Sequence, residues 1–296
     1  MAKITAQTEF GGAWTQQKLE CLAKYLSAYT QIFHKNPRAR HFDTTYVDAF
    51  AGTGYLKTPE IPLLELMPEL MENVEEYQKG SVVRALEVEP GFDHYVFIEK
   101  DAERFRELQA LRKKFPEKDI HLNQEDANSF LQKWCAHLDP KKSRAVVFLD
   151  PFGANVSWSV IESIATTKAI DLWILFPIFA VNRMLIRDRK PPEGWSRRLD
   201  QIFGTRDWEN EFYTVFHSSL FESVGLESPE SIEKVADYEK IGAFFVARLR
   251  SIFVAAADPL VLTNSRGSPL YLFCFAAGNQ RGATTGLKIA RDIIRK

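Results

Sequence analysis

The residues best suited to chemistry stand where short apolar segments end. The segment 145–149 leads directly into Asp150, Pro151 and Phe152. Because a proline fixes the local backbone, the carboxylate and the aromatic ring are held rigidly next to each other. A carboxylate, a backbone carbonyl and a ring together suit a planar group that carries an amino function. This tripeptide is therefore the first candidate for a catalytic site.

A second set of residues has the composition of a nucleotide-like binding site. Asp48 lies inside the apolar segment 44–50, and Gly52 and Gly54 follow that segment one residue apart. Glycine has no Cβ, so positive φ is allowed and a ligand can touch the backbone. Glu99 closes another apolar segment, where an acid of a nucleotide-binding sheet accepts hydrogen bonds from the ribose hydroxyls. A solvated acid at the end of a strand is the alternative.

Asp126 follows a third, shorter segment, 121–123. An acid at this position can meet the amino group of an adenine if the strand ends at the same edge of a sheet. It can equally be the N-cap of the helix that follows, because Asp is a favoured capping residue. The sequence leaves both interpretations open.

The stretch from 183 to 198 is basic. Arginine and lysine beside aromatic residues suit the phosphates and the bases of a nucleic acid. A solvated charged surface is the other interpretation. Its basic residues, against two acids, are Arg183, Arg187, Arg189, Lys190, Arg197 and Arg198. We take Arg183, Arg197 and Arg198 as candidate substrate contacts.

Alternating buried strands and amphipathic helices must position these residues. Alternation of this kind predicts a doubly wound, mostly parallel α/β sheet, which gathers the strand ends along one edge. The expected strands are 44–50, 95–99, 121–123, 145–150 and 170–176. The expected helices are 14–34, 82–88 with Ser81 as N-cap, 102–115, 158–165, 238–253 and about 286–294.

Two further strands, 260–262 and 270–275, end the sheet. A parallel crossover needs about a dozen residues or more, so this close pair must be an antiparallel hairpin. The fold class is then α/β, with a seven-stranded sheet whose last strand is antiparallel. Two insertions interrupt it, at about 57–79, which is rich in proline and glutamate, and at 185–235, which is expected to form helices and turns.

Length and composition limit the class of protein. The 296 residues carry a net charge of −1, so bulk charge does not mark a polyanion binder. Cys21, Cys135 and Cys274 lack the spacing of a zinc site or a disulfide framework, and no metal is expected. No signal pattern and no apolar run of about 18 residues occurs. We expect one cytoplasmic domain, 1–296, with no membrane partner.

With a hairpin after five alternating strands, the chain resembles the class I S-adenosylmethionine-dependent methyltransferases. That fold is a seven-stranded sheet whose last strand is antiparallel. The pattern Asp48-x-Phe50-x-Gly52-x-Gly54 resembles the methionine-binding motif of these enzymes. The resemblance implies S-adenosylmethionine as the cofactor and Glu99 as the acid that binds its ribose.

The resemblance extends to the acceptor side. Asp126 matches the acid that contacts the adenine, and Asp150-Pro151-Phe152 resembles the catalytic motif of the amino-methylating branch. That motif contains a second proline, whereas this chain has Gly153. The resemblance therefore implies N-methyl transfer, with one departure that bears on its geometry.

As an ordered set, segments along the chain are similar to the three-Cys-motif partner protein family of bacteria. That family is regarded as methyltransferase-like and is named for a genomic partner with three cysteines, itself linked to iron–sulfur, radical-type chemistry. The resemblance implies such a protein as a partner; the three cysteines of this chain are not that motif. The segments are the helix with Trp14, Lys18 and Tyr25, then 48–52, 97–101, 126–128, 148–153, 171–183 and 271–279.

Two other functions compete with methyl transfer. A dehydrogenase fingerprint needs a third glycine, whose position is Lys57 here, and a ribose acid about 20 residues on, whereas Glu99 lies 45 residues after Gly54. A non-catalytic cofactor-binding or regulatory partner stays open because the second proline is absent. For an enzyme, the acceptor is either a flipped-out nucleic acid base gripped by the basic stretch or the three-cysteine protein.

Overall fold

The computed structural model describes residues 13–52, 74–151, 155–216 and 231–295. Its centre is a sheet in which five neighbouring strands run parallel. In spatial order these are β3 (Ile120–Asn123), β2 (His94–Ile98), β1 (Asp43–Asp48), β4 (Ser143–Leu149) and β5 (Ile170–Phe176). Next to β5 lies the antiparallel β10 (Pro269–Ala277), which also pairs with the short β8 (Ala255–Ala256) and with β9 (Leu260–Thr263).

The prediction of a doubly wound, mostly parallel α/β sheet with an antiparallel last strand is confirmed. The strands of a sheet covered on both faces are buried throughout, so their sequences are continuous apolar runs, and their positions were readable. The predicted hairpin is present, with Leu262 of β9 opposite Tyr271 of β10. The sheet contains eight strands, one more than predicted, because β8 adds two residues beside β10.

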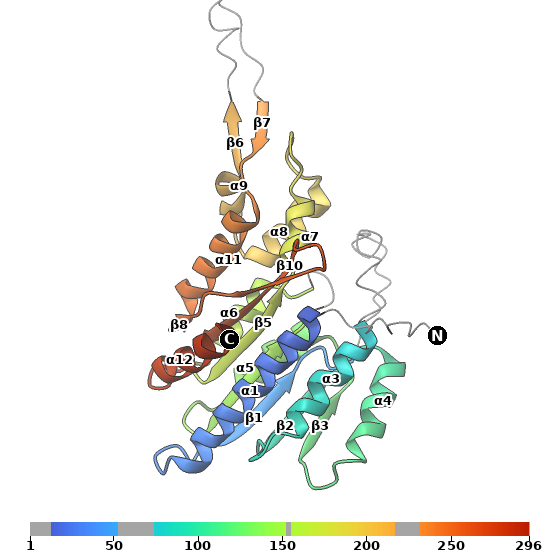
Figure 1. Cartoon of the computed structure of the whole chain (residues 1–296), viewed down its shortest axis with the longest axis vertical. Coiled ribbons are helices and arrows are strands. Elements are labelled where there is room, and N and C mark those ends of the chain that lie inside the picture. Colours follow the sequence, from blue (N-terminus) through green and yellow to red (C-terminus); the bar gives the residue numbers. More distant parts are fainter. Residues whose placement is uncertain (1–12, 53–73, 152–154, 217–230, 296) are drawn as a thin grey trace, which may run out of the picture.

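Helices cover both faces of the sheet (Figure 1). The core beneath one face includes Tyr46, Phe148 and Trp173, and the core beneath the other includes Val47 and Val147. The first face is covered by α1 (Ala13–Lys35), α3 (Val74–Leu86), α4 (Ala102–Arg112) and α12 (Ala283–Ile294). The second face is covered by α5 (Ala127–His137), α6 (Trp158–Thr166) and α11 (Tyr238–Ile252).

Two predictions are wrong, one beside the first predicted insertion and one within the second. Ser81 does not begin a helix over 82–88, because it lies inside α3, which already starts at Val74. The segment 185–235 contains the helices α8 (Glu193–Phe203) and α9 (Asp207–Phe212), but also an antiparallel hairpin that was not predicted. Its strands are β6 (Tyr213–Phe216) and β7 (Ser231–Lys234), and Figure 1 shows them extending away from the main body.

The remaining elements link the last parallel strand to this hairpin. The short α7 (Ile178–Met184) follows β5, and α8 ends at Gly204, whose φ of 65° is a conformation that favours glycine. The part of the predicted insertion between 57 and 73 lies outside the described residues. Across the described ranges, none of the helices has the length and apolarity needed to cross a membrane.

Candidate active site at the carboxyl edge of the sheet

Strand alternation decides which helices the edge acids face. Asp48 ends β1, and Asp150 directly follows β4, the neighbour with which β1 pairs. Side chains along a strand alternate between its two faces, so Asp48 shares a face with Tyr46 and Asp150 shares it with Phe148. Both aromatic residues belong to the core beneath α1 and α3. The two acids therefore point toward these helices at the carboxyl edge.

A lysine from α1 meets the second of these acids. Lys18 Nζ donates a hydrogen bond to Asp150 Oδ2 over 2.7 Å, and the two side chains are 0% and 5% exposed. Burial disfavours both charges, so it lowers the pKa of Lys18 to about 8 and raises the pKa of Asp150, against their mutual attraction. The pair fixes Asp150 at the edge and covers it from solvent.

Asp48 is held by a separate set of donors. Its side chain is fully buried; Oδ2 accepts a hydrogen bond from Ser81 Oγ at 2.8 Å, and Oδ1 accepts one from the Phe50 backbone N–H at 3.3 Å. Burial raises the pKa of Asp48 to about 7, although these hydrogen bonds act in the opposite direction. Ser81 thus ties α3 to β1, and Asp48 supports the glycine turn from beneath.

The glycine turn and the end of β2 are in close contact. A Cβ placed on Gly52 would lie 2.8 Å from Glu99 Oε2 and 2.9 Å from Arg104 Cβ, so a side chain there needs rearrangement. Glu99 Oε1 accepts a hydrogen bond from the Asp101 backbone N–H at 2.7 Å, and Asp101 in turn caps α4. Burial raises the pKa of Glu99 to about 7. The predicted cofactor residues Gly52 and Glu99 are therefore brought together.

The acid after β3 and its neighbour secure the next part of the edge. Asp126 is the N-cap of α5, with Oδ1 accepting the Ser129 backbone N–H at 3.1 Å. Asn128 holds the segment that follows β4: its Nδ2 donates to the Asn155 carbonyl at 2.9 Å, and its Oδ1 accepts the Ser157 backbone N–H at 3.0 Å. Sequence reasoning missed these hydrogen bonds of Asn128, because the segments that follow β3 and β4 come together only in the folded sheet.

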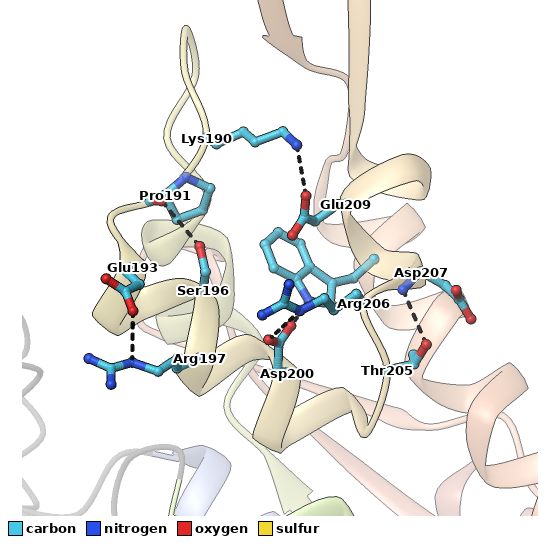
Figure 2. Close-up of polar contacts among 11 residues, drawn as sticks. Lys190, Pro191, Glu193, Ser196, Arg197, Asp200, Thr205, Arg206, Asp207 and Glu209 are labelled. Atoms are coloured by element: carbon cyan, nitrogen blue, oxygen red, sulfur yellow. Dashed lines mark hydrogen bonds and ion pairs between the residues drawn. The ribbon is translucent and has the colours of Figure 1, made fainter.

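The basic stretch is partly neutralised by its own neighbours (Figure 2). Lys190 Nζ donates to Glu209 Oε2 at 2.8 Å, which connects the middle of the stretch to α9. One turn apart on α8, Arg197 Nε lies 4.0 Å from Glu193 Oε1. Because the Arg197 side chain is 69% exposed, this pair is open to solvent and Arg197 stays accessible to a ligand.

The other two candidate arginines differ in their surroundings. Arg198 donates to the Asn155 side chain, so α8 reaches the same segment that α5 holds, and burial lowers the pKa of Arg198. The Arg183 guanidinium lies 5.3 Å from the centre of the Phe179 ring. Arg198 is therefore placed to brace the segment after β4, whereas Arg197 is exposed to solvent.

The described residues place most of the predicted site along one edge, whereas Gly54 and Phe152 lie outside them. Pro151 is buried directly after Asp150. The main residue that sequence reasoning missed is Lys18. A usable signal was present, because a lysine stands in the apolar stripe of the first helix, four residues after Trp14 and four before Leu22.

Comparison with known proteins gives likenesses of fold. No family model matches the sequence, and no curated protein matches it. The N-terminal domain of EvdMO1, solved with SAH bound, is 11% identical over 86% of this chain and 80% of that chain, with a TM-score of 0.37. The putative methyltransferase yhhF from Escherichia coli is 13% identical over 72% and 87%, with a TM-score of 0.29. LPL1258 from Legionella pneumophila is 15% identical over 75% and 84%, with a TM-score of 0.39.

Proposed function

We propose that the protein is an S-adenosylmethionine-dependent methyltransferase that binds its cofactor at the carboxyl edge of the sheet. The observation that carries this proposal is the contact between Gly52, after β1, and Glu99, after β2. In a doubly wound sheet, ligands bind outside the carboxyl ends of the strands, and the acid at the second strand accepts the ribose hydroxyls. The strand order, with an antiparallel β10 beside β5, agrees with the same class of enzyme.

The edge acids fit the positive charge of this cofactor. Asp48, Glu99 and Asp150 are all at least 96% buried, and burial raises their pKa values even though Lys18 lies beside Asp150, so a further positive charge nearby would stabilise their ionised forms. A sulfonium and an ammonium group would supply that charge. When bound, S-adenosylmethionine provides a methyl group on its sulfonium. Glu99 would then accept hydrogen bonds from the ribose hydroxyls, the Gly52 backbone would allow the cofactor to approach closely, and Asp126 would face the adenine.

We further propose an amino group as the methyl acceptor. Asp150 Oδ2 is engaged by Lys18, so its other oxygen and the Pro151 carbonyl are the acceptors available to orient an amino group. The finer proposal is a nucleic acid base, with Arg183 and the exposed Arg197 near the phosphates. The resemblance to the three-Cys-motif partner family supplies the rival acceptor, the three-cysteine protein itself.

A specific observation favours a second function, a non-catalytic cofactor-binding or regulatory partner. Asp150 is only 4% exposed, and a buried lysine occupies one of its oxygens. An acid covered in this way is suited to holding the edge together, even when no acceptor is present. In that function the protein binds the cofactor and transfers nothing, and its partner, the three-cysteine protein in the family it resembles, carries the chemistry.

Calorimetry with S-adenosylhomocysteine tests the cofactor site. Glu99→Ala should weaken binding by about 1.5–3 kcal/mol, because two charge-assisted hydrogen bonds are lost, whereas Glu87→Ala, at an exposed position, should bind like wild type. Wild-type affinity in Glu99→Ala would refute the assignment. Transfer of labelled methyl to DNA, RNA or protein, lost in Asp150→Ala with cofactor affinity kept, supports the enzyme. Binding without transfer to any acceptor supports the second function.

A further inference from the structure

The amino edge of the sheet, opposite the candidate active site, contains a cavity of about 580 Å³. It lies between the end of α1 and the start of α12, two helices that pack against each other. Arg144, near the start of β4, and Asp171, near the start of β5, line it from the sheet. A volume of this size is typical of sites for small molecules. No residue of the proposed cofactor site lines it, so a ligand here is independent of the proposed function.

Positive charge dominates the wall of this cavity. Arg38, Arg144 and Arg281 line it, and Asp171 is the one acid among the lining residues. Within the described ranges, none of the three arginines forms an ion pair with a carboxylate. Burial lowers the pKa of Arg144, Tyr29 and Asp171 act in the opposite direction, and repulsion from Arg281 adds a smaller lowering. Three guanidinium groups around one cavity therefore have an uncompensated excess of positive charge.

One of these arginines is held rigidly in place. The Arg144 guanidinium donates to the carbonyls of Pro140 and Ser143, at 2.5 and 2.7 Å, and it lies 3.8 Å over the centre of the Phe42 ring. A guanidinium whose position is fixed in advance loses little freedom when it binds an anion. Arg38 and Arg281, which are exposed, complete the basic rim.

The floor of the cavity is aromatic and can also accept a hydrogen bond. Tyr25 and Tyr29 are buried and line the floor, and the Tyr25 hydroxyl donates to Asp171 Oδ2 at 2.8 Å. Phe33 and Phe42 add rings to the wall. Aromatic side chains favour contact with planar rings, and Asp171 can accept a hydrogen bond from a ring that carries an amino or imino group.

We propose that this cavity binds a phosphorylated small molecule of nucleotide size, with its phosphate among Arg38, Arg144 and Arg281 and its planar ring against Tyr29 and the neighbouring aromatic side chains. The basic rim recognises the phosphate by charge-assisted hydrogen bonds. The aromatic floor distinguishes a nucleotide from a free phosphate ion. The site is separate from the carboxyl edge, so both ligands can be bound at once.

Calorimetry with guanosine and uridine monophosphates tests the proposal, in the presence of saturating S-adenosylhomocysteine to exclude binding at the other edge. We expect at least one nucleotide to bind. The double variant Arg38→Ala/Arg281→Ala should weaken it at least about tenfold, since both side chains lie at the rim and can be removed without opening the core. Arg266→Ala, in the exposed β9–β10 turn, serves as the matched control and should bind like wild type.

Each contrary result overturns a definite part of the proposal. The absence of binding by every nucleoside monophosphate at millimolar concentration overturns the site. Equal affinity for inorganic phosphate overturns the role of the aromatic floor. Binding that is seen only when S-adenosylhomocysteine is left out, or an unchanged affinity in the double variant, places the ligand elsewhere and overturns the site. If a single-stranded oligonucleotide binds at these arginines much more tightly than the nucleoside monophosphates do, the proposed ligand is wrong and the site binds a nucleic acid strand.

Discussion

Replacing Lys18 by methionine tests whether the buried ion pair organises the carboxyl edge. Methionine keeps the length and the apolar stem of the side chain and removes the charge. The Asp150 side chain, only 5% exposed, then loses the cation that lies 2.7 Å away. Breaking a buried pair from one side costs about 3–5 kcal/mol, a large share of the about 5–15 kcal/mol that stabilises a domain. We expect Lys18→Met to lower the free energy of unfolding by about 3–5 kcal/mol at pH 8.

The pH dependence and a double variant separate this effect from a packing defect. Without Lys18 the pKa of Asp150 rises further, so the acid can become neutral, and the loss should be smaller at pH 6 than at pH 8. Lys18→Met/Asp150→Asn removes both charges and should recover most of the stability. Urea unfolding followed by tryptophan fluorescence measures all three proteins. A loss below about 1 kcal/mol at pH 8, or single losses that simply add in the double variant, would refute the reasoning.

Two further predictions concern the same edge. Gly52→Ala should lower the free energy of unfolding by about 1–3 kcal/mol and weaken the binding of S-adenosylhomocysteine, because its Cβ would lie 2.8 Å from Glu99 Oε2. Urea unfolding measures the stability and calorimetry measures the affinity. An unchanged stability and an unchanged affinity would contradict this prediction. Burial raises the pKa of Asp48 from 3.8 to about 7, so its stabilising proton is fully bound below pH 4 and is lost as pH rises through 7. Between pH 6 and 8 this group should therefore lower the free energy of unfolding by about 1.4 kcal/mol, and an equal fall in Asp48→Asn would disprove its role.

The sequence predicted the parallel strands well because their burial has a direct signature. β5 runs from Ile170 to Phe176, as expected, and the other parallel strands shift by only one or two residues at their ends. The β6–β7 hairpin had no such signature. Its strands are four residues each, and β6 ends at Phe216 whereas β7 begins only at Ser231, so neither a long apolar run nor the two-residue spacing of a tight hairpin marks it in the sequence. A prediction from local pattern could not find it.

Some residues of the candidate site were likewise predictable from the sequence, and others were not. Asp48, Glu99 and Asp150 were found because acids at the ends of apolar runs stand out in the chain. The role of Lys18 could not be found in this way, because its partner lies 132 residues away. Only the docking of α1 on one particular face of the sheet brings the two side chains together. The choice of face follows from strand alternation and the packing of the whole core, which local sequence does not contain.

The two edges of the sheet carry charged groups of opposite sign, acids at the carboxyl edge and arginines at the amino edge. The net charge of −1 for the whole chain does not reveal this difference. At the carboxyl edge, burial raises the pKa values of Asp48, Glu99 and Asp150 even though Lys18 and Arg104 lie beside them. A further positive charge at this edge would stabilise the ionised acids, which agrees with the cationic cofactor that we propose for it.

At the amino edge, Arg144 and Arg281 repel each other across a cavity with one acid on its wall, so this edge favours an anion. The 23-residue α1 joins the two edges, because it places Lys18 at the first and Tyr25 at the second. Both residues donate hydrogen bonds to acids with raised pKa values, Lys18 to the buried Asp150 and Tyr25 to the half-buried Asp171. A shift of this helix would therefore alter both acids together, which would give the two proposed ligand sites a physical route by which either could influence the other.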